Sequence, residues 1–166
     1  MNSSRYVLGL HPSSRGFGWA LFAASGTLVD CGVSEVQGEK KNVRMLIRIE
    51  ALLERYEPVQ LALEAVDTDS SRRKSRIRRL CPAIVLRAQR RGITVHEYSR
   101  GQIANAFGLE ADATRHAVAA AIAREVEQLQ PRLPRPQKIW LGEDHIMGLF
   151  CAAACALTHL KTSANG

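Results

Sequence analysis

The sequence predicts one α/β domain built on a five-stranded mixed sheet, with the first three strands antiparallel and helices flanking both faces. Three apolar runs at the start of the chain, residues 6–10, 17–22 and 28–36, are separated by turn-forming residues, which is typical of consecutive hairpins. Strand and helix patterns then alternate, as in parallel strands joined by helices. The 166 residues, 46% of them apolar, suit one compact domain. We expect this domain to span residues 1–161, followed by a flexible tail at 162–166.

The later elements follow from residue spacing and from helix breakers. Leu46, Ile49 and Leu53 recur at helical spacing, so a helix is expected over residues 41–56, and Pro58 ends it. The remaining elements expected are a buried strand at 59–66, a basic helix at 72–91, a strand at 93–98 and helices at 102–107, 114–129 and 143–160. A stiff, extended connector before the last helix is predicted from Pro131, Pro134 and Pro136.

Positive charge is concentrated in one segment of the chain. Lys and Arg outnumber Asp and Glu by 23 to 16, and the formal net charge is +7. Such a surplus on a folded domain indicates a polyanionic partner, with a domain that is basic only for solubility as the alternative. No acid interrupts residues 72–91. We expect nucleic-acid contacts from this basic cluster and from the turn at residues 13–15, whose backbone N–H groups can hold a phosphate. The expected contact residues are Ser13, Ser14, Arg15, Arg72, Arg73, Lys74, Arg76 and Arg79.

The expected compartment follows from what the sequence lacks. No segment has the pattern of a signal peptide, and no apolar stretch reaches the roughly 20 residues needed to cross a bilayer. The four cysteines have no Cys-x-x-Cys spacing and lie in apolar patterns, where a free cysteine behaves as a small hydrophobic residue. These features predict a reduced, cytoplasmic protein without structural zinc.

Several acidic side chains are candidates for chemistry. Glu64 ends an apolar strand, where a carboxylate is costly unless it is paired or binds a metal, so we interpret it as functional. Asp67 and Asp69 follow in a loop and are better explained as turn and capping residues, with Asp67 as a reserve ligand. Asp112 is expected to cap the helix that follows it. Asp144 begins the last helix, where it is either a site residue or an acid that complements the helix dipole.

Three segments carry a resemblance to a known family. The first, YVLGLHPSSRGFGWA at residues 6–20, runs from a strand into a small-residue turn and a Gly-aromatic-Gly strand. The second, LALE at residues 61–64, is similar to a strand that presents a catalytic Glu, and the third is a small-residue helix that ends in ALTH at residues 156–159. In this order and spacing they resemble the RuvC-like Holliday-junction resolvases of the RNase H-like superfamily. The resemblance covers nearly the whole chain in element order and implies the RNase H-like fold.

The site that this resemblance implies departs from the family pattern. His11 stands in place of the family's first carboxylate, and Gly148 and Cys151 stand where the last helix of the family carries two Asp. The resemblance implies that the first strand, the fourth strand and the last helix bring together Glu64, Asp144 and His11 as a catalytic and metal-binding site for Mg²⁺ or Mn²⁺. Three roles stay open for His11: a metal ligand better suited to Mn²⁺, a general acid or base, or the mark of a lost active site.

The function implied is that of a metal-dependent, structure-selective endodeoxyribonuclease that cleaves branched DNA such as Holliday junctions. Enzymes of this type work as homodimers, so that two sites cut two strands. Two alternatives stay open. One is a catalytically inactive RNase H-like domain that binds nucleic acid, which the residues at positions 11, 148 and 151 favour. The other is an RNA-processing nuclease of the YqgF-like branch.

Overall fold

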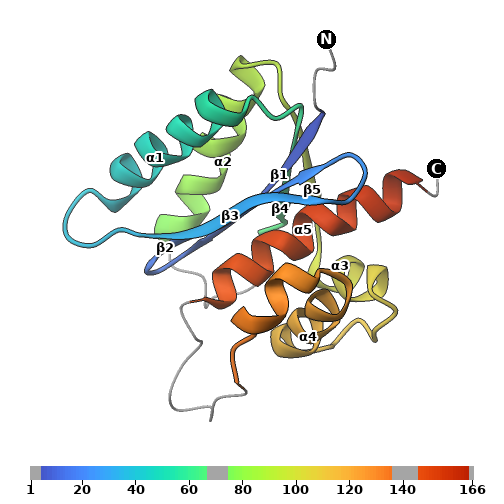
Figure 1. Ribbon diagram of the computed structural model, residues 1–166. Coiled ribbons are helices and arrows are strands. Elements are labelled where there is room, and N and C mark those ends of the chain that lie inside the picture. The colour runs from blue at the N-terminus through green and yellow to red at the C-terminus, as the bar shows by residue number, and fades with distance from the viewer. Residues whose placement is uncertain (1–4, 67–74, 136–145, 165–166) are drawn as a thin grey trace.

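The computed structural model describes residues 5–66, 75–135 and 146–164, which form three layers (Figure 1). The strands are β1 (Tyr6–Ser13), β2 (Gly16–Ala23), β3 (Leu28–Glu35), β4 (Gln60–Glu64) and β5 (Thr94–Tyr98). The helices are α1 (Lys41–Tyr56), α2 (Ser75–Arg90), α3 (Arg100–Ala106), α4 (Arg115–Glu125) and α5 (Met147–Ala164), with a 3-10 helix, η1 (Glu127–Arg132), after α4. α1 and α2 pack together on one side of the sheet, and α5 lies against the other side with α3 and α4 outside it.

The five strands form one mixed sheet in the order β3-β2-β1-β4-β5. β1, β2 and β3 are antiparallel neighbours, whereas β4 runs parallel to β1, and β5 runs parallel to β4. The predicted fold class is therefore confirmed. Because β1, β4 and β5 run in the same direction, their carboxyl ends meet at one edge of the sheet, which we call the carboxyl edge. In open α/β sheets this is the edge at which ligands bind.

Both faces of the sheet are buried, and side-chain alternation decides which residues face which helices. On β1, Leu8 belongs to the core shared with α1 and α2, whereas Val7 belongs to the core on the α5 side. The two-residue period of a strand therefore turns His11 toward α5. The same period turns Glu64, two residues after Ala62, toward α5. Sequence position alone thus brings these two polar side chains to one face.

Two glycines allow α5 to lie directly against the strands. A side-chain carbon added at Gly9 would lie 2.0 Å from the backbone oxygen of Ala152, and one added at Gly18 would lie 2.1 Å from the backbone of Gly148. A larger residue at either strand position would therefore push the helix away. Since Gly18 is opposite His11 in the β1–β2 register, the second contact holds the start of α5 beside the end of β1.

The structure differs from the sequence prediction at several places along the chain. The helix expected over residues 114–129 ends at Glu125, where α4 gives way to η1. β1 continues through His11 to Ser13, because hairpin pairing with β2 extends that far and leaves a turn of two residues. Pro131 lies inside η1 rather than in an extended connector, since its fixed φ fits a 3-10 turn. α5 runs past Lys161 to Ala164.

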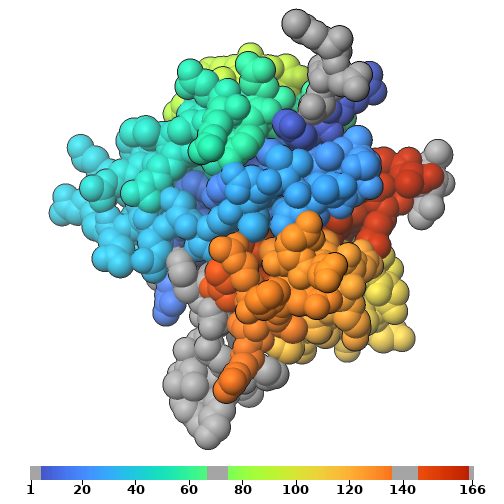
Figure 2. Space-filling model, viewed as in Figure 1, coloured from blue at the N-terminus to red at the C-terminus, as the bar shows by residue number. Residues whose placement is uncertain are grey.

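In the space-filling view the edge strand β3 lies at the surface between the α1–α2 layer and the orange surface of α4 and η1 (Figure 2). None of the helices that the structure describes has the length and apolar character required to cross a membrane.

Candidate functional site

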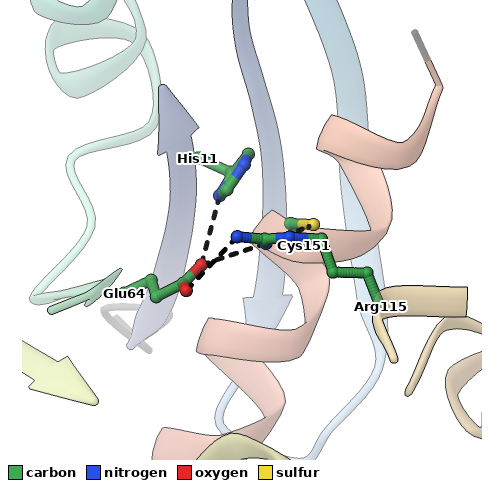
Figure 3. Close-up of polar contacts among 4 residues, drawn as sticks. All are labelled: His11, Glu64, Arg115 and Cys151. Carbon is green, nitrogen blue, oxygen red and sulfur yellow. Dashed lines mark hydrogen bonds and ion pairs between the residues drawn. The ribbon is translucent and has the colours of Figure 1, made fainter. Parts of the chain in front are cut away.

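Three elements meet at the carboxyl edge, and each contributes one side chain to a compact polar cluster (Figure 3). His11 comes from β1, Glu64 from the last position of β4 and Cys151 from the first half of α5. The Nδ1 atom of His11 lies 3.7 Å from Oε2 of Glu64. The first strand, the fourth strand and the last helix therefore meet as the sequence predicts.

A fourth residue, Arg115, reaches the same point from α4. Its Nη1 donates a hydrogen bond to Glu64 Oε2 at 3.1 Å, and its Nη2 donates one to Oε1 at 3.4 Å, so the guanidinium faces both carboxylate oxygens. Nη1 also lies 3.2 Å from Cys151 Sγ. Thr114 caps α4 by accepting a hydrogen bond from the backbone N–H of Ala117 at 3.1 Å. This cap fixes the first turn of α4 and hence the direction from which Arg115 enters the cluster.

The cluster is buried, which makes its charge balance decisive. The side chains of His11 and Glu64 each keep 7% of their exposure, and that of Arg115 keeps 26%. A carboxylate removed from water to this extent requires a partner that replaces its hydration. Arg115 is such a partner, because its planar guanidinium directs N–H groups at both oxygens.

A small cavity lies beside this ion pair. Its volume is about 30 Å³, and its polar lining includes Glu64, Arg100, Arg115 and Cys151. Such a volume holds one or two water-sized groups, not an organic ligand. Apolar side chains, among them Ile103, Val118 and Phe150, form the rest of its lining.

The described side chains do not form a site for Mg²⁺. This ion requires near-octahedral coordination by oxygen. Within the cluster the described carboxylate is that of Glu64, and both of its oxygens face Arg115. His11 and Cys151 offer nitrogen and sulfur, which suit softer ions. In residues 5–66, 75–135 and 146–164, no three His, Cys, Asp or Glu side chains are grouped to hold a metal.

Basic residues near the carboxyl edge differ in what they contact. Arg76 binds the protein itself: its Nη2 donates to the backbone oxygen of Ser13 at 3.0 Å, and its Nη1 donates to Asn42 Oδ1 at 2.9 Å. It thereby ties the start of α2 to the β1–β2 turn and to α1. Among the members of the predicted contact set that the structure describes, Ser14, Arg15 and Arg79 are exposed.

Some of the residues predicted from the sequence lie outside the described ranges, and one predicted role belongs to a different residue. Outside the described ranges lie Asp67, Asp69, Arg72, Arg73, Lys74 and Asp144. The prediction that Asp112 caps this helix is wrong, since Thr114 caps α4. Arg115 does not follow from any sequence pattern, because it pairs with Glu64 across 51 positions of the chain. The one available signal was indirect: a carboxylate predicted to be buried needs a cation, and Arg115 stands at the start of an alanine-rich helix.

Comparison with known proteins gives the same fold. Thermus thermophilus RuvC is 20% identical, covers 97% of this chain and 96% of that chain, and superimposes with a TM-score of 0.71. The T. thermophilus RuvC in complex with a Holliday junction substrate is 21% identical, with the same coverage of both chains and the same TM-score. The fowlpox virus Holliday junction resolvase is 14% identical, with 95% of this chain and 99% of that chain covered and a TM-score of 0.56. These likenesses confirm the predicted RNase H-like fold.

The family follows from the sequence match. A search of curated proteins found no match. Residues 7–139, well over half of the chain, match the family model described as crossover junction endodeoxyribonuclease RuvC. The chain therefore belongs to the RuvC family.

Proposed function

We propose that the protein acts on branched DNA, Holliday junctions in particular, as a structure-selective endodeoxyribonuclease of the RuvC type. The observation that carries this proposal is the convergence of His11, Glu64 and Cys151 at the carboxyl edge, at positions that the family resemblance assigns to its site. The family match and the likeness to a RuvC bound to its Holliday junction substrate support the same substrate class. Exposed cations at this edge, such as Arg15 and Arg100, suit the phosphate backbone of DNA.

Each residue of the cluster has a role that its chemistry allows. Glu64 presents a carboxylate at the end of a central strand, which pairs with β1 as far as Leu63 and with β5 as far as Glu64 itself. His11 lies 3.7 Å from this carboxylate and is suited to take a proton from an attacking water or to give one to the leaving oxygen. Arg115 orients the Glu64 carboxylate through both of its oxygens.

The cofactor, the assembly and the location belong to the same proposal. RuvC-family resolvases depend on a divalent metal ion, and Mg²⁺ or Mn²⁺ is the cofactor that we assign to cleavage, with His11 favouring Mn²⁺. Asp144 is the further ligand that we expect, and Glu64 is available to an ion only when it leaves Arg115.

A homodimer would present two sites to the two DNA strands. None of Cys31, Cys81, Cys151 and Cys155 is in a disulfide, which suits the reducing cytoplasm.

The ion pair between Glu64 and Arg115 favours a second candidate function, which is binding of branched DNA without cleavage. The guanidinium neutralises the carboxylate that cleavage requires. Gly148 and Cys151 also stand where the family resemblance places acids. In this second candidate the fold and the basic surface are retained for DNA binding, and the reaction is lost.

Junction cleavage separates the two candidates. A labelled four-way DNA junction is incubated with wild type and with Glu64→Gln, in Mg²⁺ and in Mn²⁺. Glu54→Gln, which changes an exposed acid on α1, is the matched control. We expect wild type and Glu54→Gln to cut the junction and Glu64→Gln to bind it without cutting.

Each other outcome has a definite meaning. Binding without cleavage by wild type in both ions supports the second candidate. Cleavage that persists in Glu64→Gln contradicts the site. Preference for structured RNA in a competition assay supports the YqgF-like alternative, and failure to bind either nucleic acid at low salt contradicts all three. Analytical ultracentrifugation of wild type measures whether the expected homodimer forms.

A further inference from the structure

The closed end of the β1–β2 hairpin projects beyond the neighbouring strand at the carboxyl edge. β1 pairs with β4 as far as Leu10 and Leu63, whereas it pairs with β2 as far as Ser13 and Gly16. At ~3.3 Å per residue, Ser13 lies about 10 Å further along β1 than Leu10. Residues 13–16, which we call the hairpin tip, therefore form a projection next to the polar cluster.

The backbone of the hairpin tip is held from three directions. The backbone oxygens of residues 13, 14 and 15 each accept a hydrogen bond from elsewhere in the chain. The donors are, in that order, Nη2 of Arg76 at 3.0 Å, Nζ of Lys41 at 3.1 Å and the backbone N–H of Val36 at 2.9 Å. In Figure 1 the closed end of the hairpin lies beside the start of α2, the helix that carries Arg76. The carbonyl oxygens, which would repel an anion, are thus occupied by donors of the protein.

Three cations surround the hairpin tip, and none of them forms an ion pair with a carboxylate of the described residues. Besides the tip, Arg76 donates to Asn42 Oδ1 at 2.9 Å and to Met45 Sδ at 3.4 Å, which are neutral acceptors. Lys41 donates to a neutral carbonyl group, and Arg15 itself is exposed. Positive side chains held this close together favour an anionic partner.

The hairpin tip also offers hydrogen-bond donors. Ser14 and Arg15 are both exposed. Within the described part of the chain, no residue accepts a hydrogen bond from the Ser14 backbone N–H or from the Arg15 guanidinium. A turn N–H beside a guanidinium is a donor set that suits the oxygens of a phosphate group.

We propose that the hairpin tip binds one backbone phosphate of branched DNA and thereby sets which phosphate of that strand lies over the polar cluster. Arg15 makes the contact, while Lys41 and Arg76 hold the backbone of the tip and add positive charge behind it. His11 belongs to the same hairpin, so the spacing between the tip and the polar cluster is fixed. The inference rests on the proposed binding of branched DNA, and it applies to the cutting and the non-cutting candidate alike.

Junction binding at several salt concentrations tests the phosphate contact. Fluorescence anisotropy of a labelled four-way junction gives the Kd in EDTA, or in Ca²⁺ if binding requires a divalent ion. Arg15→Ala should raise the Kd about tenfold, because a charge-assisted hydrogen bond is lost. It should also lower the slope of log Kd against log salt by about one, because one phosphate contact is lost.

Two further variants show that the effect belongs to the charge of Arg15. Arg15→Lys keeps a cation at the tip and should retain the salt slope of wild type. Arg55→Ala removes an exposed arginine from the opposite end of α1, and this matched control should bind as wild type does. Since Arg15 is exposed, its replacement should leave the fold intact, which circular dichroism checks.

Neutral methylphosphonates, placed one at a time near the branch point, locate the phosphate that the tip binds. One position should weaken wild-type binding about tenfold and leave the binding of Arg15→Ala unchanged, because that variant has already lost the contact. If wild type cuts the junction, Arg15→Ala should cut at neighbouring phosphodiesters as well, because the register of the strand is no longer fixed.

Equal Kd values and salt slopes for wild type and folded Arg15→Ala would overturn the inference and leave the proposed function in place. The same holds if every methylphosphonate weakens wild type and Arg15→Ala equally, since the tip would then contact none of the phosphates. Absence of junction binding by wild type, in EDTA and in Ca²⁺, would instead contradict the proposed function together with the contact at the tip.

Discussion

Replacement of Arg115 by alanine should destabilise the protein by about 3 kcal/mol, because it leaves a buried carboxylate without its cation. The Glu64 side chain keeps 7% of its exposure, so water cannot replace the two N–H groups that Arg115 directs at its oxygens. For a chain of this length, about 1 kcal/mol corresponds to a shift of roughly 2–4 °C in melting temperature. The expected loss is therefore about 6–12 °C.

Replacement of Glu64 by glutamine should cost less stability than replacement of Arg115. The two single variants and the double variant together therefore measure how strongly the pair is coupled. In Glu64→Gln it is Arg115 that loses the carboxylate; its side chain keeps 26% of its exposure and can turn toward solvent, so we expect a loss of about 1 kcal/mol. In the double variant both charges of the pair are removed together. Its stability should lie close to that of Glu64→Gln, which gives a coupling energy of about 2–3 kcal/mol.

Urea unfolding of wild type, both single variants and the double variant, followed by circular dichroism, measures this coupling. Arg124→Ala on the same helix should stay within about 0.5 kcal/mol of wild type, because it removes an exposed side chain. A coupling energy below about 0.5 kcal/mol would mean that Glu64 and Arg115 act independently. The account of the cluster as a buried ion pair would then be refuted.

Three other regions of the structure give further predictions. Gly18→Ala should cost about 1–3 kcal/mol in urea unfolding, because its new carbon would lie 2.1 Å from the backbone of α5, whereas Gly101→Ala, whose new carbon lies 3.4 Å from its nearest neighbour, should cost less than about 1 kcal/mol. Burial lowers the pKa of His159, so the unfolded chain binds its proton more readily; stability should be complete above about pH 6.5 and decrease as the pH falls below it, and the slope should flatten in His159→Gln. Arg76→Ala should cost about 1–3 kcal/mol, because it loses hydrogen bonds to the β1–β2 turn and to α1, whereas the exposed Arg79→Ala should change stability little; equal effects of the two variants would contradict the structural role of Arg76.

The fold was largely predictable because its signals are local. Hairpin turns fix the antiparallel start of the sheet, and the strand–helix alternation fixes the parallel remainder. The alternation of side chains is also local, and it places His11 and Glu64 on one face before any tertiary contact is known. The end of β1 was less predictable, because its pairing beyond Leu10 depends on β2 alone, and the residues there resemble a turn.

The candidate site was predictable in part. The position of Glu64 at the end of an apolar strand identifies it, since a buried acid demands a partner. The identity of that partner depends on how α4 packs against α5, and no local pattern encodes this packing. Arg115 therefore emerges from the structure, as does the use of Arg76 for internal hydrogen bonds in place of solvent exposure.

The contacts at Gly9 and Gly18 position α5 against the sheet without using the side chains of the candidate site. They set the spacing between α5 and the sheet through backbone atoms, so side chains at the carboxyl edge can change while the framework stays in register. A side-chain carbon added at Gly148 would lie 3.5 Å from its nearest neighbour, which is ordinary van der Waals contact. The scaffold thus has room for the first carbon of a side chain at that position, and a protein engineer could begin there with Gly148→Ala without redesigning the contact between α5 and β2.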